Sequence, residues 1–250
     1  MKYFAIAVLM IVAGCSTQKP LPASCYPVSI DHDSASRLND MSWWAYRFRI
    51  PWPEKDDKPD FAVDLLLAHA IVRPVLQKNS EKLLMWRFHR RAARKPPGHQ
   101  FSFLFYADRD TAIEVINNLD NDPLLASARN AGLINSTSST KTEITKKLAA
   151  EDYSDPSWSP QIQRTWPFYI MGVSAFWLAL IDEIKSELTY TNTNNAEQHV
   201  DEVRDMLEIY RQVDEKIAEI WKDEGQHALL HHLSAVFGYK PMWLKKEVIY

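Results

Sequence analysis

The chain has 250 residues, of which 46% are hydrophobic and 24% are charged, and its formal net charge at pH 7 is −3. This length and apolar content suffice for one large domain or two small ones with a buried core. A general nucleic-acid-binding protein is usually basic overall, so the near-neutral charge argues against nucleic acid as a partner.

The first fifteen residues have the pattern of a secretory signal. Lys2 supplies a positive charge, residues 4–13 form an unbroken apolar run, and small residues precede Cys15. A basic start, an apolar core of about ten residues and a small-residue cleavage site are typical of a signal peptide. The run is too short to cross a bilayer core of about 30 Å as a helix.

The sequence Val12-Ala-Gly-Cys15 resembles the lipobox of bacterial lipoproteins. The resemblance covers only this signal region, and it implies that Cys15 is acylated and anchors the mature chain in a membrane. Ser16 follows the cysteine, and in lipoproteins of two-membrane bacteria a residue other than Asp there implies the outer membrane, facing the periplasm. The only other cysteine, Cys25, would then have no partner in its own chain.

The mature chain is expected to have three parts after the signal peptide of residues 1–14. Residues 15–40 carry the lipid and include three prolines among small polar residues, which is typical of an extended tether. Residues 41–134 are expected to form an α+β part. A Ser/Thr-rich stretch near 135–140 is the expected boundary, and residues 141–250 are expected to be mainly helical, either separately or in one domain with the preceding part.

Three stretches of alternating residues predict strands over 43–50, 83–91 and 99–106, and the last two flank a Pro-Pro-Gly loop that is typical of a hairpin. A helix is expected over 61–77, with Asp60 as its cap and Pro74 ending or kinking it. The predicted fold class is therefore α+β, a small antiparallel sheet with helices on one face. The residues expected on its aromatic face are Trp44, Tyr46, Phe48, Ile50, Leu84, Trp86, Phe88, Phe101, Phe103 and Phe105.

Capping residues and apolar spacing predict the remaining helices. Asp122 and Gly132 bracket a short helix that follows one over 110–118, and Thr140 with Glu143 predicts a capping box for a helix to Ala150. A helix over 160–188 contains sixteen consecutive apolar or small residues and is expected to be the buried centre of the C-terminal part. From residue 196 an amphipathic helix follows with a very acidic polar face, and a last helix is expected to end at Phe237 with Gly238 as its cap.

One candidate site is a basic face of the predicted sheet. Between Glu81 and Arg109 the chain has seven bases and two acids, against the overall balance. Guanidinium groups on adjacent strands bind phosphate or carboxylate bidentately, so the face predicts a site for an anionic envelope ligand or an acidic protein surface. The alternative is a solvated face, or one paired internally with the acidic helix. The candidate residues are Arg47, Arg49, Arg87, His89, Arg90 and Arg91, with Gln100 and Ser102 beside them.

A second candidate site is a metal site at Glu224, His227 and His231. On an α-helix these positions share a face, and carboxylate and imidazole are normal zinc or iron ligands. The Glu-x-x-His part resembles half of the di-iron motif of ferritin-like bundles. That motif needs a second copy, which this sequence lacks, so ordinary surface histidines are the alternative and no cofactor is the main expectation.

No motif in the sequence names a reaction. A Gly-x-Ser-x-Gly elbow and a phosphate-cradling glycine loop are both missing from the sequence. The preferred interpretation is a non-enzymatic, membrane-anchored envelope lipoprotein that binds a protein or an anionic ligand. The alternatives are an envelope metalloenzyme and a structural subunit of an envelope complex that uses the acidic helix as its contact. Trp43, Trp52 and Trp158, in or beside expected loops, are candidate platforms for a ligand.

Overall fold

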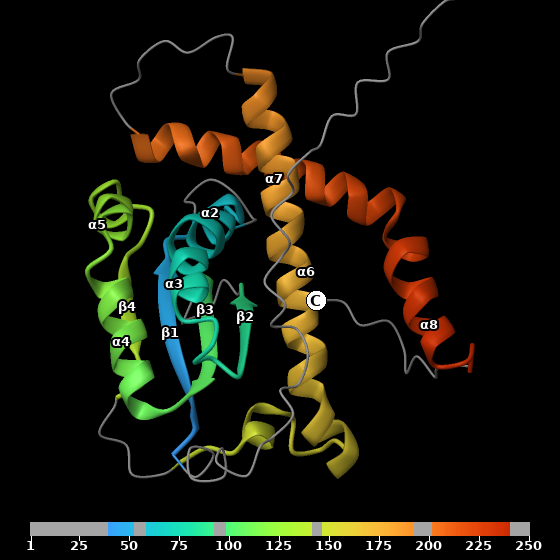
Figure 1. Ribbon diagram of the computed structural model, residues 1–250. Coiled ribbons are helices and arrows are strands. Elements are labelled where there is room, and N and C mark those ends of the chain that lie inside the picture. Colours follow the sequence, from blue (N-terminus) through green and yellow to red (C-terminus); the bar gives the residue numbers. More distant parts are fainter. Residues whose placement is uncertain (1–39, 53–58, 93–98, 142–146, 193–201, 241–250) are drawn as a thin grey trace, which may run out of the picture.

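The computed structural model describes residues 40–52, 59–92, 99–141, 147–192 and 202–240 (Figure 1). The signal peptide, Cys15, Cys25 and nearly all of the expected tether lie outside the described residues. Within them the fold is α+β, as the sequence predicts. An antiparallel sheet is covered by helices on one face, and a mainly helical C-terminal part follows it.

The sheet has the strand order β2-β3-β1-β4, and all neighbouring strands are antiparallel. The strands are β1 (Ser42–Ile50), β2 (Met85–Arg91), β3 (His99–Ala107) and β4 (Ser136–Ser139). Pairing of Met85 with Tyr106 and of Arg91 with Gln100 confirms the predicted β2–β3 hairpin, although the Pro-Pro-Gly turn lies outside the described residues. The Ser/Thr stretch expected to be a linker is instead the edge strand β4, because its backbone pairs with β1.

The helices in chain order are α2 (Ala62–Leu66), η1 (Leu67–Val72), α3 (Arg73–Lys78), α4 (Arg109–Asp120), α5 (Pro123–Asn130), η2 (Ala150–Tyr153), α6 (Pro160–Asn192), α7 (Glu202–Asp223), η3 (Gln226–His231) and α8 (His232–Val236). Of these, η1 and η3 are π-helical and η2 is a 3-10 turn. The helix expected over 140–150 is not seen in residues 147–149, and residues 142–146 lie outside the described part.

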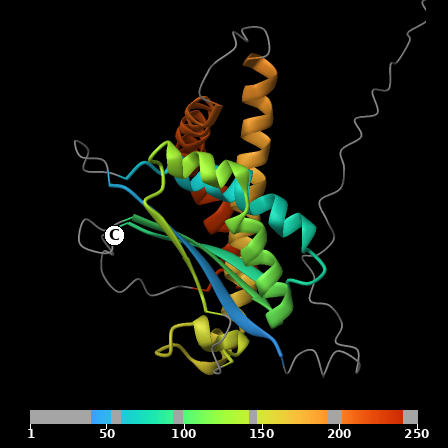
Figure 2. The ribbon, with the colours of Figure 1, turned by 90° about the vertical axis from the view of Figure 1, so that its left-hand side faces the viewer.

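The aromatic face of the sheet forms the core. Strand register places Phe48 opposite Phe101 and Phe103 opposite Phe88, so the rings of three strands meet on one side. Helices α2, α3, α4 and α5 cover that side (Figure 2). The alternation of the strands therefore correctly predicts which face is buried, because successive side chains point to opposite faces.

Pro74 does not end the helical run that begins with α2. This run continues through η1 and α3 to Lys78. The π-helical turn η1 lies directly before the proline, and the Arg73 N–H bonds to the Ala68 carbonyl. A proline ring clashes with the carbonyl four residues earlier and has no N–H to donate. A wider π turn is one way to accommodate both effects without a break.

Helix termination at Gly132 follows the sequence expectation. Gly132 has φ +76°, and the Asp122 carboxylate accepts the Leu125 N–H at 2.9 Å at the other end of α5.

Gly132→Ala should lower the free energy of unfolding by about 1 kcal/mol, because a Cβ disfavours a left-handed backbone. Gly172→Ala, on an open face of α6, should raise it by up to about 1 kcal/mol through helix propensity. Urea unfolding of both variants measures this difference in sign, and a shift of the same sign in both would contradict it.

Helix α6 is not the buried centre of the C-terminal part. It is long and apolar enough, by length and composition, to cross a membrane, but only 28% of its apolar window is buried. It packs against β2 and α7, and it leaves several large apolar side chains exposed. The sequence could not reveal this, because a helix that is apolar all round has no stripe to indicate its buried side. The exposed residues are Ile162, Phe168, Tyr169, Val173 and Phe176.

The acidic helix α7 does not pair with the basic face of the sheet. Its apolar stripe is buried at Val203, Leu207, Tyr210 and Val213, as its spacing predicts, and it packs on α2 and α6. That places it beyond the helical layer, on the opposite side from the predicted basic face. The C-terminal segment ends as expected, with Gly238 at φ +69° after α8.

Candidate ligand-binding groove

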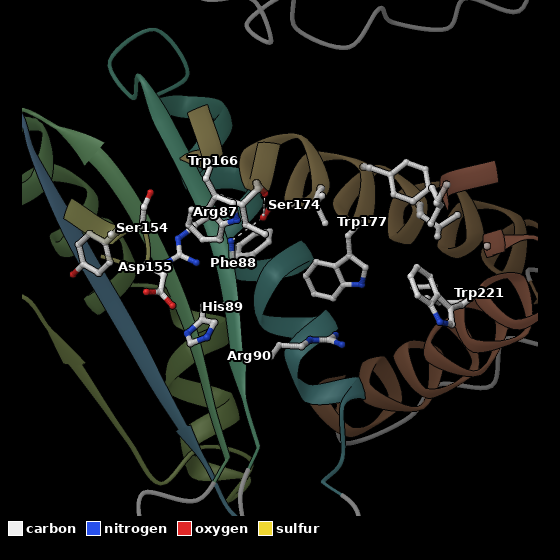
Figure 3. A pocket seen from close by; sticks show the side chains of 18 of the residues that line it. Arg87, Phe88, His89, Arg90, Ser154, Asp155, Trp166, Ser174, Trp177 and Trp221 are labelled. Atoms are coloured by element: carbon white, nitrogen blue, oxygen red, sulfur yellow. Dashed lines mark hydrogen bonds between the residues drawn. The ribbon is translucent and has the colours of Figure 1, made fainter. Parts of the chain in front are cut away.

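A groove of about 840 Å³ runs along the β2 edge of the sheet (Figure 3). Residues 87–90 of β2 form one wall, α6 forms the second, and the end of α7 with η3 forms the third. The chain after η2 closes one end with residues 153–158. Its volume lies in the range of small-molecule sites, and its lining is mostly aromatic and aliphatic.

Helix α6 is held against the exposed edge of β2 by a specific contact. The Phe88 N–H donates to the Ser174 hydroxyl at 3.1 Å, and the rings of Phe88 and Trp177 lie 5.5 Å apart. An edge strand presents unpaired N–H and C=O groups, and covering it with a helix removes a site of unwanted strand pairing. Because α6 lies at the edge, residues from both sheet faces border one groove.

Arg87 is the most unusual residue in the groove. It is only 8% exposed, its guanidinium carbon lies 4.8 Å from the centre of the Trp166 ring, and the Tyr153 ring is 5.9 Å away. Among the described residues no carboxylate forms an ion pair with it, and its buried Nε has no hydrogen-bond acceptor. Burial lowers the pKa of Arg87 from its ordinary value. A buried charge without a partner is costly, so this site favours an external anion.

Arg87 carries the positive charge at its end of the groove, because the neighbouring lining residues His89 and Asp155 are neutral and acidic. Burial lowers the pKa of His89, and the charges of Arg87 and Arg91 lower it further, so His89 is neutral at pH 7. Asp155 borders the same end, and hydrogen bonds from the Ser157 side chain and from the Ser157 N–H, the latter at 2.8 Å, lower the pKa of its carboxyl group. Figure 3 shows Arg87, Ser154 and Asp155 together at one end of the groove.

Arg90 lies on the opposite face of the sheet from the other candidate basic residues. Its register partner is Phe101 of the aromatic face, and its Nε bonds to the fully buried Asp64 at 3.0 Å. His99 Nε2 lies 2.9 Å from the same carboxylate, and Trp177 stacks on the guanidinium at 4.4 Å. Arg90 therefore ties α2 to the sheet, and its charge is compensated inside the protein.

The rest of the predicted basic face is brought together by register. Arg47, Ser102 and His89 lie side by side across three strands, and Arg49, Gln100 and Arg91 lie beside them. Arg91 is exposed, and both Arg47 and Arg49 are half-buried. At the other end of this face the indole of Trp43 is buried and donates to the Ala150 carbonyl at 2.9 Å, so it is not a ligand platform.

Sequence reasoning missed the groove but indicated four of its residues. Arg87, His89 and Arg90 belong to the predicted anion site, and Trp158, a candidate ligand platform, packs on Trp166 at 5.4 Å in the groove lining. The apolar wall residues of α6 were assigned to a core instead. Nothing in the sequence places α6 against the β2 edge, since that contact joins residues 86 positions apart.

The metal hypothesis gains no geometric support. Among the described residues no three His, Cys, Asp or Glu side chains are grouped to hold a metal ion. Gln226–His231 is π-helical, so the α-helical spacing that would align Glu224 with His227 and His231 does not apply. The His227 and His231 rings stack on each other with centroids 5.2 Å apart.

A partly buried polar cluster attaches α6 to the core away from the groove. Arg73 donates to both carboxylate oxygens of Asp182, at 2.8 Å for Nη2 and Oδ2. His69 Nε2 lies 3.1 Å from the same carboxylate, and its Nδ1 lies 2.9 Å from the Tyr210 hydroxyl. Burial raises the pKa of Tyr210, so the hydroxyl stays protonated and the cluster is a structural one.

The free energy of unfolding should decrease as the pH is lowered, because of His69. Burial lowers the pKa of His69 below its ordinary value of 6.5, although Asp182 opposes the shift and Lys185 and Arg73 add to it. The folded state thus binds the proton less well than the unfolded state, and stability is lost as pH falls through about 6.5 towards the lower folded pKa. Urea unfolding at pH 7.5 and 5.5 should show this loss, with a smaller difference in His69→Gln. An equal difference in both proteins would contradict it; His89 adds a loss of the same sign in both.

Comparison of the chain with protein-family models, with curated proteins and with solved structures finds no match. The groove geometry therefore carries the functional argument. It combines a large apolar wall with one buried guanidinium that has no carboxylate partner among the described residues, an arrangement that can bind an anionic ligand with an apolar body.

Proposed function

We propose that this protein is a lipid-anchored bacterial envelope protein, without enzymatic activity, that binds an anionic ligand in the groove between β2, α6 and η3. The Val12-Ala-Gly-Cys15 sequence supports attachment to a membrane through lipid on Cys15, and the Ser16 position favours the outer membrane with the domain facing the periplasm.

The observation that carries the proposal is the burial of Arg87 without an anionic partner among the described residues. Arg73 and Arg90, two other arginines that contact α6, each bond to a carboxylate. A fold that compensates those charges but not Arg87 leaves a guanidinium fork available to a carboxylate or phosphate from outside. Within the predicted basic face, the proposed anion site is therefore the part at the groove, where Arg87 lies.

The test uses an anionic and a neutral aromatic dye on the full mature chain with Cys15→Ser, which carries no lipid and needs no detergent. The anionic dye is 8-anilinonaphthalene-1-sulfonate, and N-phenyl-1-naphthylamine is its neutral counterpart. Fluorescence titration should show preference for the anionic dye, and Arg87→Met should weaken its binding at least tenfold while leaving the neutral dye unchanged. Arg109→Met removes the same charge from an exposed position on α4 and should change neither. Equal affinity of the wild type and Arg87→Met for the anionic dye would overturn the proposal.

A further inference from the structure

We infer that the ligand is a long-chain fatty acid, bound with its carboxylate at Arg87 and its acyl chain along α6 towards Trp221. This inference rests on the proposed function and names the chemical class of ligand for the same groove.

The two ends of the groove differ in chemistry. Arg87, Ser154 and Asp155 gather at one end, while Trp221 lies at the other end with Trp177 between them (Figure 3). The α6 and α7 walls between the ends are apolar, with Ile170, Val173, Phe176 and Leu180 from α6 and Ile217 and Ile220 from α7. Arg90 borders the β2 side between the ends, where it is paired with Asp64. A ligand that complements the whole groove has one charged end and a long apolar body, because burial of apolar surface favours binding and a buried polar group needs a partner.

The volume of the groove fits one acyl chain. A sixteen-carbon fatty acid has about 18 non-hydrogen atoms and, at about 30 Å³ for each, needs less space than the 840 Å³ of the groove. A single-chain lipid can therefore be accommodated along the groove.

The charge at the polar end favours a carboxylate. Arg87 is one cation, His89 is neutral at pH 7 because its pKa is lowered, and Asp155 contributes a negative charge nearby. A carboxylate brings one negative charge, while a phosphate monoester brings about −1.5 to −2. A planar guanidinium also matches the two oxygens of a carboxylate bidentately.

Three probes separate the head group from the chain. Calorimetric titration of the unlipidated mature chain (Cys15→Ser) uses palmitate, acetate and hexadecanol, each below the concentration at which it aggregates. Palmitate should bind at least tenfold more tightly than acetate, which has the head without the chain. It should also bind at least tenfold more tightly than hexadecanol, which has the chain without the charge.

Two exposed positions on α6 provide a matched test of the chain path. Val173 lines the groove and is 43% exposed, so Val173→Asp should fold normally and weaken palmitate binding at least tenfold. Ile162 is 50% exposed on the same helix but outside the groove lining, so Ile162→Asp should bind palmitate as the wild type does. Arg87→Met should reduce palmitate binding to the level of hexadecanol.

Contrary results overturn either the fatty-acid inference alone or the proposed function as well. Acetate binding as tightly as palmitate, or equal palmitate binding by Val173→Asp and the wild type, would overturn the fatty-acid inference. Both results leave the anion site at Arg87 intact if the dye titration succeeds. If neither palmitate nor the anionic dye depends on Arg87, the inference and the proposed function both fail.

Discussion

Replacement of Arg87 by Met is expected to weaken anion binding at least tenfold and yet to stabilise the protein. Methionine replaces the Arg87 side chain as far as Nε and carries no charge near Trp166 and Tyr153. Because the buried guanidinium has no carboxylate partner among the described residues, its removal relieves a desolvation cost. We expect the free energy of unfolding to rise by about 1 kcal/mol in the absence of ligand.

Urea unfolding of the wild type and Arg87→Met, without and with palmitate, measures the change in the free energy of unfolding. The wild type should gain stability from the ligand and the variant should not, since only a ligand that binds the folded state shifts unfolding. A variant that is less stable than the ligand-free wild type would show that Arg87 has a structural role. In that case the burial of Arg87 would not indicate an anion site.

Asp64→Asn is expected to cause the largest loss of stability. Asp64 is fully buried and its carboxylate contacts Arg90 at 3.0 Å and His99 at 2.9 Å. Removing its charge leaves Arg90 partly buried without a counter-ion, and breaking such a buried pair costs about 3–5 kcal/mol. Urea unfolding followed by tryptophan fluorescence should detect this shift.

Glu114→Gln is the matched control for Asp64→Asn. Glu114 pairs with Lys82 at 2.7 Å on the protein surface, where both side chains are well exposed. Solvent screens that pair, so the control should lose far less stability than Asp64→Asn. Comparable losses in the two variants would contradict the assignment of the Asp64 cluster as a structural centre.

The sheet could be predicted from sequence because its information is local. Alternation in Trp44, Tyr46 and Phe48 identifies the buried face, and the β2–β3 pairing follows from the short Pro-Pro-Gly connection. Helix ends at Asp122, Gly132 and Gly238 could be predicted for the same reason. In contrast, β4 has polar residues and becomes a strand only because β1 supplies its hydrogen bonds.

The groove could not be predicted because it depends on where α6 packs. Arg87 and Arg90 are three residues apart in a basic run and have the same local signal, but one is compensated by Asp64 and the other is not. That difference arises from Asp64 on α2 and Trp166 on α6, which are distant in sequence. Local charge therefore indicated the correct strand and included Arg87, but it could not distinguish Arg87 from Arg90.

The most direct measurement is the identification of lipid that is bound non-covalently to the native protein. The lipidated protein and its Arg87→Met and Arg109→Met variants are extracted from their own membranes without detergent, and solvent-released lipids are quantified by mass spectrometry. We predict close to one long-chain fatty acid per wild-type or Arg109→Met protein, and little from Arg87→Met. Equal recovery from all three proteins, or no single-chain acid from the wild type, would contradict the account.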